Sequence, residues 1–298
     1  MDGLLLIDKP AGMTSFDVVR RVRRLANTKK VGHTGTLDPD ATGLLPIVIG
    51  QCTKLANFLV LDQKEYVFDV CFGSTTDTLD STGEVVATGP WEHIDEAALC
   101  AALNGFLGTI MQVPPAYSAL KVNGKRAYEL ARKGEEVHLA ARPIAIHAIE
   151  LLAFDPPSAR LRVACGSGTY VRSLARDLGE ALGSLAHTTS IRRTAIGAFH
   201  VDQAHALDAL DPELFSSYLI EPLTMLASVQ GHEASEAERI ALGYGQRITI
   251  DADFALDSAV IVRSQDARLI AVAIVEEIVE PGRLRLKPKR VFDPSGTP

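Results

Sequence analysis

The residues best suited to chemistry lie in a loop rich in glycine and threonine that spans residues 31–46. It reads Val-Gly-His-Thr-Gly-Thr-Leu-Asp-Pro-Asp-Ala-Thr-Gly-Leu-Leu-Pro. Asp38 precedes Pro39, which favours an extended backbone, so its carboxylate would project from a stiff corner. Such a charged carboxylate is suited to nucleophilic catalysis. Three glycines permit positive φ or the close approach of a ligand: Gly32, Gly35 and Gly43.

The same composition is also typical of a surface turn, because Asp-Pro steps and Gly/Thr clusters mark turns. In the catalytic interpretation, hydroxyl and backbone donors would orient Asp38 and keep it ionised, and they come from Thr34, Thr36 and Thr42. His33 is a lone histidine beside carboxylates and lacks a plausible ligand set for zinc, so we expect no metal here.

The run 32–46 resembles the motif of the TruB family, bacterial tRNA pseudouridine synthases that act on the uridine of the TΨC loop. The resemblance implies that Asp38 is the nucleophile. It also implies that His33, five residues earlier, helps to hold the extruded nucleotide. The chemistry would isomerise one uridine, at tRNA position 55, by attack of Asp38 at either C1′ or C6, and the sequence leaves both open.

A second segment that resembles the family is Lys64-Glu-Tyr66. It begins a strand-like alternation over residues 64–72, whose pattern alone makes Tyr66 a core aromatic residue. The resemblance implies instead that Tyr66 stacks on the target base and takes part in proton movement at C5 of uracil.

Residues 165–172, Cys-Gly-Ser-Gly-Thr-Tyr-Val-Arg, resemble a third family motif. On pattern alone, Arg172 is a surface cation and Gly-x-Gly a weak phosphate-binding signal. The resemblance implies that Arg172 pairs with Asp38 and that Tyr170 lines the uridine pocket. Residues 187–199 resemble the family's Leu-Arg-Arg segment, with Ile191 where the family has the leucine that touches the substrate. This departure leaves the exact contact open.

The polar segment 73–84 carries Asp77 and Asp80, a pair that would also suit a magnesium site for phosphodiester chemistry. The resemblance implies a structural role, in which Asp80 accepts a salt bridge from a buried arginine.

Residues 112–132 resemble the family's mobile insertion, which clamps the RNA stem-loop. Asn123-Gly124 is a turn signal, and residues 126–132 predict a short cationic helix. Cations suited to phosphate contacts are interleaved with the stacking candidates Tyr117 and Tyr128. The predicted RNA-binding cations are Lys121, Lys125, Arg126 and Arg132.

The net charge of −7 argues globally against a nucleic-acid partner, but the cations are clustered. Most of the 30 lysines and arginines lie in residues 20–30, 121–133 and 283–290, together with Arg192 and Arg193. Each patch alone fits a solvated face. Together they predict a basic track against a repelling background.

The family resemblance implies an α+β fold. The sequence itself predicts a strand at 3–7 and a helix from Thr14 or Ser15 to about Ala26. The family implies a mixed, largely antiparallel sheet flanked by helices. Further predictions are helices at 52–59, at 95–103 and up to 183, strands at 142–154, 160–165 and 187–199, and a polar loop at 73–84.

We expect a catalytic domain over residues 1–228, with the clamping insertion at about 105–143, and a small β domain over 229–298. Short strands at 247–250, 259–263, 269–275 and 283–292 resemble a PUA-type RNA-binding module, and a stabilising β appendage is the alternative. We expect the tail from Pro294 to be disordered.

With no signal peptide or membrane span, we expect a cytoplasmic protein with reduced, mostly buried cysteines. The implied partner is the tRNA T stem-loop. The isomerisation needs no redox or energy input, so no cofactor is expected, and we expect a monomer that requires no protein partner. Two rivals remain: a magnesium nuclease using Asp38, Asp40, Asp77 and Asp80, and a non-catalytic RNA-binding protein.

Overall fold

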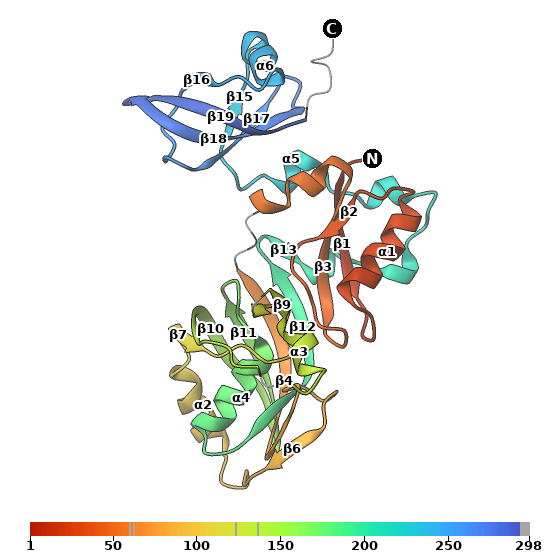
Figure 1. Cartoon of the computed structure of the whole chain (residues 1–298), viewed down its shortest axis with the longest axis vertical. Coiled ribbons are helices and arrows are strands. Elements are labelled where there is room, and N and C mark those ends of the chain that lie inside the picture. The colour runs from red at the N-terminus through yellow and green to blue at the C-terminus, as the bar shows by residue number, and fades with distance from the viewer. Residues whose placement is uncertain (60, 62, 123, 136, 293–298) are drawn as a thin grey trace.

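A mixed sheet of ten strands runs through the larger part of the molecule (Figure 1). The computed structural model describes residues 1–59, 61, 63–122, 124–135 and 137–292. The central strand order is β14-β1-β3-β12-β4-β11-β10-β7, with β2 on β3 and β13 on β12. The strands are β1 (Gly3–Lys9), β2 (Val31–His33), β3 (Thr42–Ile49), β4 (Lys64–Phe72), β7 (Gly108–Gln112), β10 (Arg142–Asp155), β11 (Ser158–Cys165), β12 (Ala186–Ile196), β13 (Phe199–His200) and β14 (His205–Ala206).

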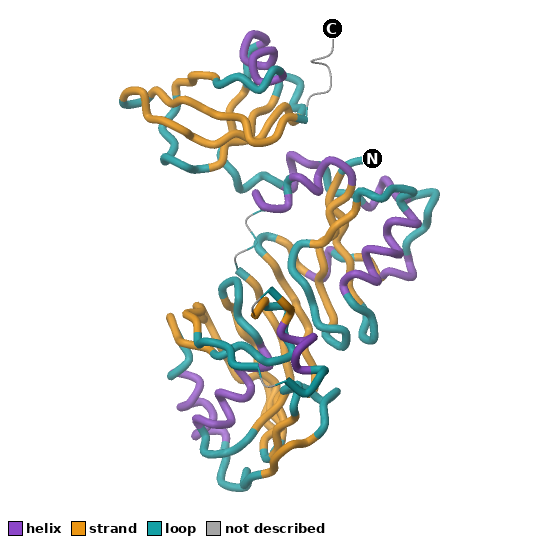
Figure 2. The backbone as a smooth tube through the Cα atoms, in the orientation of Figure 1, coloured by secondary structure: helices purple, strands orange, loops and turns teal. Residues whose placement is uncertain are grey.

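The β1–β14 and β3–β12 pairs are parallel, and the other pairs of this sheet are antiparallel. The predicted α+β class with a largely antiparallel mixed sheet is therefore confirmed. The α-helices are α1 (Ser15–Leu25), α2 (Glu96–Asn104), α3 (Ala127–Ala131), α4 (Val171–Ala181), α5 (Pro222–Met225) and α6 (Glu236–Gly243). Figure 2 shows the helices in purple and the strands in orange.

Helix α1 begins and ends where the sequence predicts. Thr14 is the N-cap and forms a capping box with Asp17, which satisfies backbone donors that the first turn leaves free. The inward face carries Val18, Val19 and Val22, and these side chains join the main core. That core also holds the inward side chains of α2 and α4, so these three helices cover the sheet.

Strand β4 has the predicted bounds, and alternate side chains along it are buried, as its period of two requires. Two predictions were wrong in detail. The helix expected at 52–59 is a pair of 3₁₀ helices, Gly50–Lys54 and Ala56–Phe58. The loop expected at 73–84 contains β5 (Ser74–Thr76), which pairs with β6 (Val85–Thr88).

The remaining short elements lie outside the main sheet or at its edge. Strands β8 (Lys121–Val122) and β9 (Lys125–Arg126) form a small hairpin in the insertion. Three further 3₁₀ helices span Val201–Gln203, Leu207–Ala209 and Phe215–Tyr218.

The C-terminal part is a second, five-stranded sheet with the order β15-β17-β18-β19-β16 and its own core (Figure 1). All four predicted strand regions are present, and a short fifth strand was missed because three residues carry too little pattern. The predicted disordered tail lies outside the described residues. The strands are β15 (Gly231–Glu233), β16 (Ile248–Asp251), β17 (Ala259–Arg263), β18 (Leu269–Glu280) and β19 (Arg283–Val291).

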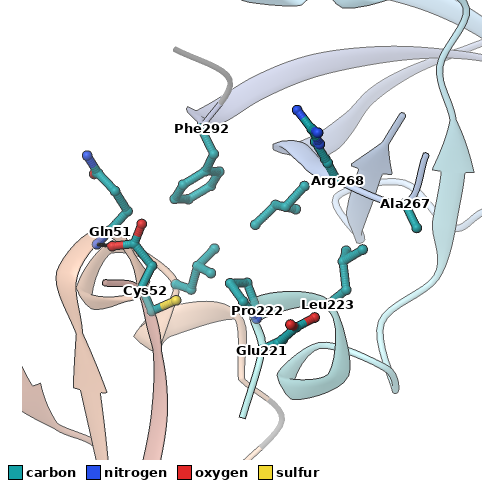
Figure 3. A pocket seen from close by; sticks show the side chains of 11 residues that line it. Gln51, Cys52, Glu221, Pro222, Leu223, Ala267, Arg268 and Phe292 are labelled. Carbon is teal, nitrogen blue, oxygen red and sulfur yellow. Dashed lines mark hydrogen bonds between the residues drawn. The ribbon is translucent and has the colours of Figure 1, made fainter. Parts of the chain in front are cut away.

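The two sheets meet through a shared apolar cluster. Leu4 and Leu44 from the first sheet belong to the same buried cluster as Ile261 and Val272 from the second. Beside it lies a cavity of about 290 Å³, into which Phe292 points from the C-terminal part (Figure 3). None of the predicted site residues lines this cavity, so it is separate from the chemistry considered next.

Two further observations concern the whole chain. No helix among the described residues is long and apolar enough to cross a membrane. All four cysteines are free. Cys52 and Cys165 are buried, whereas Cys71 is partly exposed and Cys100 exposed, so only half of the thiols fit the expected burial.

Candidate active site

The predicted nucleophile and its predicted arginine form an ion pair. Asp38 lies in the loop between β2 and β3, and its Oδ2 is 2.9 Å from Nε of Arg172, the second residue of α4. The Asp38 side chain is 42% exposed, whereas that of Arg172 is 5% exposed. A substrate can therefore reach the carboxylate, while the buried guanidinium holds it in a charge-assisted contact.

The other donors of Arg172 are also occupied. Nη1 donates to the Thr78 carbonyl at 2.8 Å, and Nη2 donates to the Tyr117 carbonyl at 2.9 Å. Asp80 Oδ2 lies 3.6 Å from Nη1, so the expected salt bridge between Asp80 and a buried arginine is confirmed. Of the suggested magnesium pair, Asp80 thus faces Arg172, whereas Asp77 Oδ2 accepts from the Tyr117 hydroxyl at 3.1 Å. Within the described ranges, no group of three or more His, Cys, Asp or Glu side chains could hold a metal ion.

Two buried side chains whose role the sequence did not reveal anchor the backbone of the Asp38 loop. Ser15 Oγ accepts from the Leu37 N–H at 2.9 Å and lies 3.1 Å from the Leu37 carbonyl, to which it donates. Lys9, at 0% exposure, donates from Nζ to the carbonyls of Pro10, Met13 and Pro39 at 2.7 to 2.8 Å. Burial lowers the pKa of Lys9 to about 8. The sequence indicates this role only through the position of Lys9 at the end of an apolar strand.

Tyr66 lies in the same region, on the inner face of β4. It is 8% exposed and stands opposite Arg193 of β12, while Ile191 stands opposite Phe68. Directly paired side chains share a face, so Tyr66 and Ile191 lie on one side of the sheet. Burial raises the pKa of Tyr66, Arg193 counteracts this, and the Asp38 carboxylate is near enough to raise the pKa further.

The predicted basic track includes Arg193, and for this residue the prediction is wrong. Its exposure is 1%, so it cannot contact phosphates. Strand alternation turns one residue of an Arg-Arg pair inward, and here it is Arg193. Arg192 instead forms a partly exposed salt bridge with Asp8.

The expected positive φ occurs at two of the three glycines. Gly35 and Gly43 have φ of +95° and +99°, and a Cβ on Gly43 would lie 2.2 Å from the Arg193 carbonyl oxygen. Gly32 has no such constraint, because a Cβ there would meet only a Val48 methyl at 3.7 Å.

The threonines do not orient Asp38 as expected. In the part of the chain that the structure describes, the Asp38 carboxylate pairs with Arg172 and accepts no hydrogen bond from a threonine. Thr34 Oγ1 is buried without a hydrogen-bond partner. Orientation therefore comes from Arg172 and from the buried anchors of the loop backbone.

His33 ends β2 and is half-buried. Burial lowers its pKa, and the positive charge of Arg193 lowers it further, so both favour the neutral imidazole. Nδ1 is buried and has no hydrogen-bond partner. A neutral ring is able to contact a nucleotide without adding charge.

Tyr170 is held just before Arg172 as the N-cap of α4. Its N–H donates to Gln112 Oε1 at 2.9 Å, and Gln112 Nε2 donates to its carbonyl at 3.2 Å. The Arg142 guanidinium lies 5.0 Å from the centroid of its half-buried ring. The structure thus brings Asp38, Tyr66 and Arg172 together, with Tyr170 two residues from Arg172.

The insertion places its cations on the surface. Lys121, Lys125, Arg126 and Arg132 are all exposed, on the β8–β9 hairpin and around α3. The guanidinia of Arg126 and Arg132 lie 5.9 and 5.7 Å from the Tyr128 ring centroid. The Tyr128 N–H donates to the Ser118 carbonyl, which ties this surface to the segment that Arg172 contacts. The turn residue Asn123 is outside the described residues.

The arrangement of strands in the two sheets is that of the pseudouridine synthase fold. The crystal structure of a Cbf5-Nop10-Gar1 complex matches with a TM-score of 0.75 at 23% identity, covering 98% of this chain and 85% of that chain. A structure of the archaeal box H/ACA sRNP Nop10-Cbf5 complex matches with a TM-score of 0.74.

Sequence comparison narrows this class to one family. The family model described as TruB family pseudouridylate synthase (N terminal domain) matches residues 23–171, and that of the tRNA pseudouridylate synthase B C-terminal domain matches residues 172–222. The tRNA pseudouridine synthase B of Arthrobacter sp. (strain FB24) is 41% identical over 99% of this chain and 98% of the relative. That of Thermobifida fusca (strain YX) is 46% identical over 82% of this chain and 86% of the relative. The chain belongs to the TruB family of pseudouridylate synthases and is an isomerase.

Proposed function

We propose that this enzyme converts uridine 55 in the TΨC loop of tRNA to pseudouridine, with Asp38 as the nucleophile on a flipped-out uridine. The observation that carries the proposal is the 2.9 Å ion pair between an accessible Asp38 and a buried Arg172 beside Tyr66. The names of the curated relatives, tRNA pseudouridine synthase B, support the substrate class.

The reaction breaks the bond from N1 to C1′, turns the retained uracil, and joins C5 to C1′. Asp38 attacks either C1′, giving a glycosyl ester and a uracil anion, or C6 of the base. Both routes need an ionised carboxylate, which Arg172 stabilises. A hydrolytic glycosidase would want a second carboxylate to activate water. Asp80 does not meet that need, because it faces the same guanidinium.

A stacked uridine is out of reach of Asp38, so the nucleotide must leave the helix stack. Tyr66 stacks on the flipped base and takes part in proton movement at C5. Tyr170 and Ile191 complete an apolar wall that keeps water away, and His33 holds the extruded nucleotide as a neutral ring. The buried inner face of β4 and β12 supports this arrangement.

The T stem-loop is recognised by its folded shape, because single-stranded loops with splayed bases are the usual targets of specific RNA recognition. Lys121, Lys125, Arg126 and Arg132 contact its phosphates, and Tyr128 supplies a stacking surface between two of these cations.

We assign residues 1–228 to the catalytic domain, with the clamping insertion at about 105–143, and residues 229–298 to a PUA-like RNA-binding domain. The enzyme acts as a monomer, without cofactor or protein partner, in the cytoplasm, where its tRNA substrate resides.

The test is incubation with an unmodified tRNA transcript in EDTA, followed by mapping of pseudouridine. We expect one modified position, 55, and intact RNA. Asp38→Asn should lower turnover by more than about 10⁴-fold and change tRNA affinity by less than about tenfold, because this carboxylate acts in chemistry rather than in phosphate binding. Asp40→Asn, two residues away, is the matched control and should keep turnover within about threefold.

The rivals predict other results. A magnesium nuclease would cut the transcript and lose activity in EDTA. Both Asp38→Asn and Asp40→Asn would lower its activity. A non-catalytic RNA-binding protein would keep its biological effect with Asn at position 38. Either pattern, or modification elsewhere in the tRNA, contradicts the proposal.

A further inference from the structure

Arg193 is one of the largest fully buried side chains in the molecule. Among the residues that the structure describes, no carboxylate forms an ion pair with it. A buried guanidinium without a counter-ion opposes folding, and an apolar residue at this inward-facing position would avoid that cost. Core packing alone therefore does not account for an arginine here.

The donors of Arg193 go to both ends of the loop that carries Asp38. Nε donates to the Leu44 carbonyl at 2.8 Å, and Nη2 donates to the Gly35 carbonyl at 3.1 Å. A Cβ on Gly35 would lie 3.4 Å from Nη1, and one on Gly43 would collide with the arginine backbone. The close approach of Arg193 therefore explains Gly43, whereas Gly35 is explained by its φ of +95°.

The same residue stands opposite Tyr66 in the pairing of β12 with β4. Its charge and hydrogen bonding lower the pKa of the Tyr66 hydroxyl, against the larger effect of burial, which raises it. Cys165 of β11 and Asp38 of the loop also face Tyr66, and their negative charge would raise its pKa. Arg193 is therefore the cation that offsets these effects at the phenol.

We propose that Arg193 is a positioning residue of the reaction, which sets the distance and charge between the Asp38 loop and the Tyr66 hydroxyl from beneath the uridine pocket. This inference rests on the proposed function, in which Asp38 and Tyr66 act on one base. Arg193 does not touch the substrate, because it is closed off from solvent. Its effect passes through Gly35, Leu44 and Tyr66.

The first test measures turnover and KM on unmodified tRNA. Arg193→Gln should lower kcat by about a hundredfold and leave KM within about threefold, because the misplaced groups act after binding. Arg193→Lys keeps the charge but not the planar fork, so we expect a smaller loss of about tenfold. The control is Arg160→Gln, which removes a two-bond pair with Asp69 in the same sheet and should leave kcat unchanged.

The second test separates positioning from simple stabilisation. With fluorinated tyrosine throughout the protein, the ¹⁹F resonance of Tyr66 is assigned by its loss in Tyr66→Phe. We expect it to titrate at higher pH in Arg193→Gln and close to the wild-type pH in Arg193→Lys. In a Tyr66→Phe background, Arg193→Gln should cost less kcat than in the wild type, because part of its effect acts through the lost hydroxyl.

An unchanged Tyr66 titration together with kcat within about twofold of wild type would overturn the proposal. The proposal would also be overturned if Arg193→Gln lowered kcat equally in the wild-type and Tyr66→Phe backgrounds and left the Tyr66 titration unchanged. That result would mean that Arg193 only supports the structure of the loop. If Arg193→Gln does not fold, Arg193→Lys decides: a kcat loss of about tenfold with KM within about threefold supports the proposal, and kcat within about twofold of wild type overturns it. The titration needs no substrate, so it stands apart from failure of the proposed function, in which the wild-type protein would make no pseudouridine.

Discussion

Arg172 donates from Nη2 to the carbonyl of Tyr117 at 2.9 Å. The guanidinium that pairs with Asp38 therefore also holds the segment from which the β8–β9 hairpin and α3 extend. The loop that carries Asp38 and the insertion, about 80 residues apart in the chain, thus contact one buried side chain. A change at Arg172 should consequently be felt in both places.

Arg172→Lys should lower turnover at least a hundredfold. A lysine ammonium cannot meet Asp38, Thr78 and Tyr117 in the geometry of a planar fork. We also expect faster proteolytic cleavage within residues 118–135, measured by limited proteolysis and mass spectrometry. Arg176→Lys is the control, since Arg176 lies one turn along α4 and donates to the Val113 carbonyl without contacting Asp38. Wild-type turnover in Arg172→Lys would contradict the assigned role.

Lys9 gives a prediction that depends on pH. Its Nζ serves three carbonyls, including that of Pro39 next to Asp38. Its pKa is about 8, and a neutral amine has only two N–H groups, so wild-type turnover should fall above about pH 8. Lys9→Met should be slower by about tenfold or more at pH 7, because Pro39 loses its anchor, and should lack this alkaline decline. A decline of equal size in the variant would assign it to another group.

The free energy of unfolding should respond to the same group with the opposite sign. The pKa of about 8 in the folded protein lies below the 10.5 of an unperturbed lysine, so the unfolded chain holds more protons between these values. The wild type should therefore gain stability relative to Lys9→Met as pH rises from about 8 to 10.5. Chemical denaturation at several pH values measures the difference. A wild-type stability that falls relative to the variant would show that the three carbonyls favour the ammonium more than burial disfavours it.

Local patterns predicted much of this fold because they report burial directly. The alternation along β4 and the capped apolar face of α1 each determine an element without reference to the rest of the chain. Arg193 shows where the prediction failed. It alternates with Ile191 and Ala195 along the strand, which indicates an inward side chain, but its charge led to the prediction of a surface position. The pairing of Asp38 with Arg172 spans 134 residues, so no local pattern carries it. Only the family resemblance did.

The cations of the insertion should account for part of the salt dependence of tRNA binding. Lys125→Ala and Arg126→Ala should each weaken binding and reduce the slope of log K against log salt by about 1, as expected for one lost phosphate contact. Lys54→Ala removes an exposed lysine from the 3₁₀ helix at 50–54 and should leave the slope unchanged. If the slope equals that of the wild type in all three variants, Lys125 and Arg126 do not contact tRNA phosphates, and the predicted role of the insertion is wrong.

The apolar cluster between the two sheets predicts that the C-terminal sheet stabilises residues 1–228. Removal of residues 229–298 would expose Met225 and Leu226, which are buried in the cluster with Ile261 and Val272. Ile261→Ala in the full chain should lower the free energy of unfolding by about 2 to 5 kcal/mol. Ile278→Ala, at a position 52% exposed in β18, should change it by less than about 0.5 kcal/mol. If the truncated chain 1–228 unfolds at the wild-type temperature, the cluster contributes nothing to the stability of residues 1–228.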